Sequence, residues 1–231
     1  MLFRSEQHFR TNESNLQLGL DLANAYIAAQ RIGAGTQVLD KIMASTQADI
    51  STLLSVAQTY AQMGDRVKVD AVLQKLQRTI PQVEAQFRAN SNDVPLAFQI
   101  VSGYLVTQQT NRAVELTDSL VARPNADGST FLSAAQVYAQ VQDVAKLEKT
   151  LQKLIAAVPN HPEAWYDLSA VQITMGKSNE ALASLRKSIE LSDARLKAQP
   201  GSKDLRSAAA TDLRFSKLQK NTDYQKLVKA K

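Results

Sequence analysis

The clearest structural signal in the sequence lies at residues 162–193, PEAWYDLSAVQITMGKSNEALASLRKSIELSD. Apolar residues recur there at helical spacing on both sides of Gly176, which predicts two helices joined by a turn. Trp165 and Leu168 lie three apart and so share one face of the first helix. Ala181 is small enough for the second helix to approach closely, and Leu185 can fill the groove between the two. The stretch therefore predicts a compact helix-turn-helix unit.

The same pattern recurs upstream, and tyrosine marks each recurrence. The marker residues are Tyr26, Tyr60, Tyr104 and Tyr138, which are separated by 34, 44 and 34 residues. Repetition at a fixed period of this length is typical of helical-repeat proteins. The longer interval places one insertion, at about residues 82–94. The predicted units cover about residues 16–47, 48–81, 95–125, 129–161 and 162–193.

In the order and spacing of their residues, these units resemble the tetratricopeptide repeat (TPR), a helix-turn-helix unit of about 34 residues. Pro81 and Pro159 stand where that repeat closes with proline. Gln172 and Asp193 depart from it, since the repeat has Tyr and Pro there. The resemblance implies an all-α fold, a right-handed TPR-like α-solenoid of about five helix pairs with a C-terminal helical cap.

Both ends of the array differ from its middle. Residues 1–14 form a polar lead without clear periodicity, and a first helix is expected to start near Ser14 or Asn15. Residues 194–231 are expected to form basic capping helices, because the last unit of a solenoid needs a polar cover for its apolar face. In that tail, residues 203–220 keep an amphipathic helical pattern, and a short closing helix follows Asn221.

The positive charge is concentrated in the tail. Ten Lys or Arg and three Asp give residues 194–231 a charge of +7, which leaves −2 for residues 1–193 out of the total of +5. A uniform nucleic-acid-binding stripe along the array is therefore not expected. The tail charge has two interpretations: the solvated face of a cap, or a docking patch for an acidic protein, nucleic acid or anionic lipid.

The insertion, residues 82–94, reads QVEAQFRANSNDV. Its first part could extend the preceding helix by a turn or two beyond Pro81, and residues 90–93 are predicted to form a polar turn. It is either a tolerated surface excursion or a functional loop at one edge of a groove.

The sequence contains no recognisable catalytic apparatus. Cysteine is absent, and the two histidines are His8 in the polar lead and His161 in a predicted turn. No phosphate-binding loop, nucleophile elbow or metal-binding motif is present. The sequence therefore predicts a protein that is not an enzyme and has no catalytic residues, no metal site, no cofactor and no small-molecule substrate.

In TPR proteins the first helix of each pair lines a concave face, so the resemblance assigns candidate contact residues here. They are Asn24, Ser55, Gln58, Gln62, Phe98, Gln99, Ser102, Gln136, Gln140, Tyr166 and Asp167. This lining is nearly neutral. Carboxamides and hydroxyls can bond a peptide backbone, and aromatic side chains can hold apolar anchors. A plainer alternative is that the glutamines are good helix formers on a wet surface.

The predicted function is a non-catalytic protein-protein interaction module or scaffold that binds a peptide or partner protein in this groove. A carboxylate clamp of the chaperone type is not expected, because only Asn24 matches the Lys, Asn and Arg residues that such a clamp requires. One alternative is an accessory assembly domain of a larger bacterial protein, either membrane-anchored or not. Another is recruitment to a polyanion through the tail, which would weaken steeply with salt.

The sequence also predicts where the protein is located and whether it associates with itself. No apolar run approaches the roughly 20 residues needed to span a bilayer, and the start has no signal-peptide pattern. The sequence as given therefore predicts a cytoplasmic protein without direct membrane contact, or a periplasmic one if it belongs to a larger exported or membrane protein. Self-association through the end helices is a further expectation.

Overall fold

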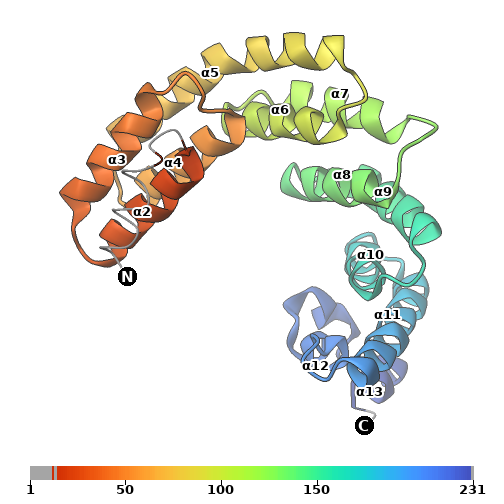
Figure 1. Ribbon diagram of the computed structural model, residues 1–231. Coiled ribbons are helices and arrows are strands. Elements are labelled where there is room, and N and C mark those ends of the chain that lie inside the picture. The colour runs from red at the N-terminus through yellow and green to blue at the C-terminus, as the bar shows by residue number, and fades with distance from the viewer. Residues whose placement is uncertain (1–11, 13–14, 230–231) are drawn as a thin grey trace. The chain divides into compact units, whose positions relative to one another are not determined.

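The computed structural model of the protein describes residue 12 and residues 15–229, which form helices and connecting turns without any strand (Figure 1). Apart from Asn12, the predicted polar lead lies outside the described residues. The helices are α2 (Leu16–Ala28), α3 (Ile32–Ala44), α4 (Ile50–Gln62), α5 (Arg66–Ala89), α6 (Val94–Val106), α7 (Thr110–Val121), α8 (Gly128–Gln140), α9 (Val144–Ala157), α10 (Pro162–Thr174), α11 (Ser178–Ala198), α12 (Leu205–Thr211), the 3₁₀-helix η1 (Leu213–Leu218) and α13 (Thr222–Lys229).

Five helix pairs share one type of turn. Each pair is joined through a residue with positive φ, and these residues are Gln30, Gly64, Gln108, Gln142 and Gly176. Each lies four residues after a marker tyrosine or, in the fifth pair, after Gln172. Left-handed backbone favours glycine, yet three of the turns use glutamine. Gly33 and Gly35, which follow the first of these turns, lie inside α3.

Aspartate starts many of the helices. The side chains of Asp49, Asp65, Asp93, Asp127 and Asp143 each accept a hydrogen bond from the backbone N–H three residues later. Such N-caps satisfy one of the free amides of the first turn. Asn15 caps α2 in the same way, and the Nδ1 atom of His161 caps α10. His161 is thus a capping residue within its predicted turn.

The insertion is helical, and Pro81 does not close the second pair. α5 continues through Pro81 as far as Ala89. Proline removes one helical hydrogen bond, but Val83 and Phe87, each 9% exposed, extend the buried stripe beyond it. Their burial favours continuing the helix. The hypothesis of a functional loop is therefore wrong for residues 82–89, and only the polar turn at about residues 90–93 remains outside a helix.

Two of the marker tyrosines lie in ion-pair triads of identical spacing. The hydroxyl of Tyr60 donates to Asp40 at 2.8 Å, and the ammonium of Lys68 contacts the same carboxylate at 2.6 Å. Burial and then the bond to Asp40 raise the pKa of Tyr60. In the second triad the bonds to the carboxylate are both 2.7 Å long. It consists of Asp118, Tyr138 and Lys146. Each triad ties one helix pair to the helix before it.

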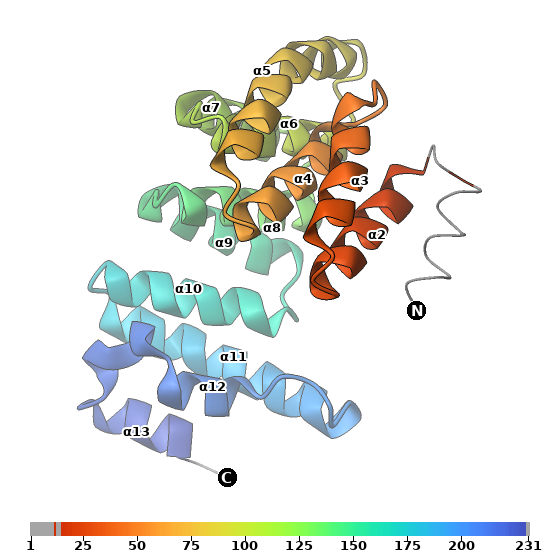
Figure 2. The ribbon, with the colours of Figure 1, turned by 90° about the vertical axis from the view of Figure 1, so that its left-hand side faces the viewer.

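The predicted C-terminal helical cap is present, although its course differs in part. α11 continues to Ala198, and α12 and α13 lie beside it (Figure 2). The amphipathic stretch at residues 203–220 is divided at Asp212 into α12 and η1. Phe215 of η1 is fully buried, and its ring meets that of Tyr166 edge-on at 5.2 Å. The cap therefore shares a core with the last helix pair.

The chain divides into two compact units, one up to Leu116 and one from Thr117, and each is described by itself below. Within the described residues, no helix combines the length and apolar character needed to cross a membrane.

Candidate protein-interaction surface

In the first unit the first helices α2, α4 and α6 are neighbours. Seven predicted contact residues lie on them. Asn24, Ser55, Gln58 and Gln62 are exposed, whereas Phe98, Gln99 and Ser102 are half-buried. Three of these side chains already have partners. Ser55 and Ser102 donate to carbonyls of their own helices, and Asn24 accepts from Thr59 at 3.4 Å.

The glutamine side chains differ from those three. Within the described part of the chain, the carboxamides of Gln58, Gln62 and Gln99 have no hydrogen-bond partner. A carboxamide offers two donors and an acceptor. These carboxamides can therefore exchange hydrogen bonds with water for hydrogen bonds with a partner, on the face that the sequence predicts for a partner.

In the second unit, α8 and α10 border a small cavity. The exposed side chain of Leu132 (39% exposed) and that of Gln136 lie at its edge, and its volume is about 230 Å³. Its apolar walls include Leu147, Leu151 and Leu154. Pockets for small molecules usually measure roughly 300–1,000 Å³. This cavity is better matched to a single side chain of a partner.

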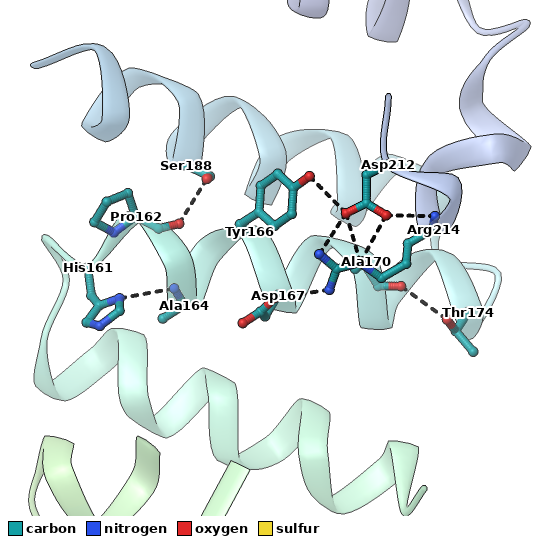
Figure 3. A network of polar contacts seen from close by, with 10 residues as sticks. All are labelled: His161, Pro162, Ala164, Tyr166, Asp167, Ala170, Thr174, Ser188, Asp212 and Arg214. Atoms are coloured by element: carbon teal, nitrogen blue, oxygen red, sulfur yellow. Dashed lines mark hydrogen bonds and ion pairs between the residues drawn. The ribbon is translucent and has the colours of Figure 1, made fainter. Parts of the chain in front are cut away.

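Arg214 of the cap also lines this cavity. Figure 3 shows its guanidinium between Asp167 of α10 and Asp212. The guanidinium contacts Asp167 at 3.1 Å and Asp212 at 2.7 Å, and it lies over the ring of Tyr166 at 5.2 Å. The hydrogen bonds from Arg214 lower the pKa of Asp212 to about 2. The sequence did not predict Arg214 as part of this surface, because its position depends on the packing of η1 against α10.

Tyr166 corrects one prediction. Only 4% of this residue is exposed, because Phe215 packs against its ring and its hydroxyl donates to Asp212 at 3.0 Å. The cap thus occupies the place where a partner would have reached it. Tyr166 is a core residue, and the prediction that it contacts a partner is wrong. Asp167 remains exposed but is paired with Arg214.

The titration of Asp212 yields a testable expectation. Its folded-state pKa lies below the ordinary value of 3.8, so its contribution to stability is present above about pH 4 and is lost as the pH falls towards 2. We expect Asp212→Asn to reduce the loss of melting temperature between pH 5 and pH 2. Thermal melts of Asp223→Asn, at an exposed position, supply the control. Identical pH profiles for wild type and Asp212→Asn would contradict this assignment.

Comparison of the second and fourth helix pairs reveals an unusual pattern. Every exposed residue of α4 has the same residue at the equivalent place in α8. The exposed residues are Ser51, Ser55, Gln58, Ala61 and Gln62, and their equivalents are Ser129, Ser133, Gln136, Ala139 and Gln140. Where the two helices differ, the α4 residue is buried. Sequence identity thus follows the solvent-facing side of the first helices.

The exposed residues of the second helices, α5 and α9, do not show this identity. Among the exposed residues of α5 from Arg66 to Arg78, only Gln74 keeps its identity in α9, as Gln152. The exposed residues of α4 thus match those of α8, whereas most exposed residues of α5 from Arg66 to Arg78 differ from their equivalents in α9.

No protein-family model matches the sequence, and no curated protein matches it either. Solved structures of similar fold include MamA from Desulfovibrio magneticus RS-1, at 15% identity over 78% of this chain and 96% of that one, with a TM-score of 0.45. YrrB, described as a TPR protein with an unusual peptide-binding site, is 13% identical over 85% of this chain and 93% of its own, with a TM-score of 0.42. PilF from Pseudomonas aeruginosa is 13% identical over 93% of this chain and 96% of its own, also with a TM-score of 0.42.

The fold of this protein is defined by features that recur along the described chain. Its paired helices, their Asp-capped starts and the tyrosines that recur in their cores are the features on which the fold is assigned. By these features, the described chain has an all-α fold of successive helix pairs that resembles the tetratricopeptide repeat.

Proposed function

We propose that this protein is a non-catalytic interaction module that binds a peptide or a segment of a partner protein on the exposed face of its first helices. The observation that carries the proposal is the set of unpartnered carboxamides on that face, above all Gln58 and Gln62 on α4 and Gln136 and Gln140 on α8. The exposed residues of α4 and α8 include no charged side chain.

The chemistry of this face suits an extended peptide. Carboxamides can donate to backbone carbonyls and accept from backbone amides, which gives affinity without requiring a particular sequence. The cavity beside Leu132 offers room for one apolar side chain, which would supply a measure of specificity. Because the exposed residues of these two helices are neutral, binding should depend weakly on salt.

The test is a pull-down from the native source with wild type and with Gln58→Glu/Gln99→Glu/Gln136→Glu. Glutamate keeps a similar helix propensity but removes the N–H donors and adds charge, so the fold should persist while the partner is lost. The matched control is Gln74→Glu/Gln152→Glu, which makes the same change on exposed faces of the second helices. Retention of the partner by the first-helix variant would refute the proposal.

Polyanion binding by the basic tail is a separate outcome that the same assay can detect. Three tail arginines, Arg195, Arg206 and Arg214, are already paired with carboxylates of the chain. Deleting the tail would uncover the core around Phe215, so charge reversal is the cleaner change. Loss of the partner in Lys217→Glu/Lys220→Glu/Lys226→Glu, together with steep weakening by salt, would place the function in the tail.

A further inference from the structure

We infer that α4 and α8 form two equivalent peptide subsites, so that the protein binds the same short, uncharged motif twice. This inference rests on the proposed function and adds the chemistry and the number of its ligands. It concerns each subsite within its own unit.

The two helices are held in the same local geometry. Asp49 and Asp127 each accept the N-cap bond of their helix at 2.8 Å, from Thr52 and Thr130. In both copies, the tyrosine that anchors the helix follows its aspartate partner by 20 residues, and the lysine follows by 28. Each subsite glutamine is therefore displayed from an equivalently capped and anchored helix.

Packing does not account for the shared surface. Gln58 and Gln136 are both exposed, as are Gln62 and Gln140, and none of these carboxamides has a partner among the described residues. Ser51 and Ser129 are different, because each hydroxyl donates to the capping aspartate and so has a structural role. The glutamines have no such role inside the chain.

Two simpler explanations also fail. Shared ancestry alone would preserve both helices of a pair alike, yet among the exposed residues of α5 from Arg66 to Arg78 only Gln74 keeps its identity in α9. Helix propensity cannot select glutamine either, since Glu, Lys and Arg are equally good helix formers and more soluble. A common ligand chemistry explains why the same side chains persist on the first helices.

The chemical class of the ligand can be inferred from the side chains that it would contact. Neither exposed face includes an acidic or basic residue, so charge complementarity favours an uncharged segment over an acidic or basic one. The carboxamides match the backbone of an extended chain. Leu54 and Leu132 occupy the equivalent place on α4 and α8, and they offer apolar contact to one side chain of that segment.

The experiment begins with a phage library of random dodecapeptides selected on the wild-type chain, and the enriched peptide is then synthesised. Isothermal titration should give two peptides bound per chain, with a neutral consensus. Gln58→Glu/Gln62→Glu and Gln136→Glu/Gln140→Glu should each reduce the stoichiometry to one and leave the affinity of the remaining subsite unchanged. The matched control, Gln74→Glu/Gln152→Glu, should retain two.

Each contrary result has a distinct meaning. A single peptide per wild-type chain that one first-helix variant abolishes would overturn the two-subsite inference and leave the proposed function standing. A charged consensus would overturn the ligand class that we infer. If no peptide is enriched, or if binding survives both first-helix variants, both the inference and the proposed function are overturned.

Discussion

Phe215→Ala is expected to lower the free energy of unfolding of the second unit by roughly 3–5 kcal/mol, the usual cost of removing a buried phenylalanine side chain. Phe215 is fully buried and packs against the rings of Tyr166 at 5.2 Å and Tyr224 at 6.2 Å. Its loss would leave a cavity at the point where η1 meets α10. Urea unfolding followed by circular dichroism measures the change.

The matched control is Leu213→Ala, two residues away on η1 and 82% exposed. Surface changes of this kind usually alter stability by no more than about 0.5 kcal/mol. Equal unfolding midpoints for the two variants would mean that η1 does not pack as the structure has it. A loss of stability in Phe215→Ala but not in Leu213→Ala would also show that the packing of the cap affects the surface of α10, because the neighbouring Arg214 lines the cavity there.

Ala181→Trp should disrupt the last helix pair. Ala181 is fully buried on α11, and α10 packs directly against that helix. An indole at this place must force the two helices apart, and overpacking of this kind typically costs about 1–3 kcal/mol and occasionally more. Thermal melts should show a lower melting temperature than for Ala183→Trp, which places the same side chain at an exposed position of the same helix.

An unchanged melting curve for Ala181→Trp would contradict the pairing of α10 with α11. Local rearrangement to accommodate the indole costs more free energy here than in a loosely packed turn, because protein interiors leave few voids of this size. The comparison with Ala183→Trp separates the effect of packing from any general effect of an added indole.

The sequence alone determined the repeating part of the fold. Tyr26, Tyr60, Tyr104 and Tyr138 are all buried, as their recurrence predicts. Each helix pair buries its apolar stripe mainly against itself and its neighbours in the chain, so the contacts that define it are close in sequence. Periodicity therefore sufficed to locate the pairs, whereas the choice of the faces that carry Gln58 and Gln136 came from the resemblance and stays a prediction.

Gln172 illustrates a departure that only packing explains. It replaces the marker tyrosine in the fifth pair, is 5% exposed, and accepts a hydrogen bond from Ser184 at 2.8 Å. The carbonyl oxygen of this buried amide thus has a partner on the second helix of the pair, and the pair keeps its turn with a different side chain at this position.

Tertiary structure decided the features that depend on distant segments or on a balance of energies. α5 passes through Pro81 because the burial of Val83 and Phe87 outweighs one missing hydrogen bond. Tyr166 is buried because η1, which begins after Asp212, packs against it. Asp212 lies 46 residues further along the chain and accepts a hydrogen bond from the Tyr166 hydroxyl. Helical periodicity encodes which face of a helix is apolar, but it does not encode which later segment will cover that face.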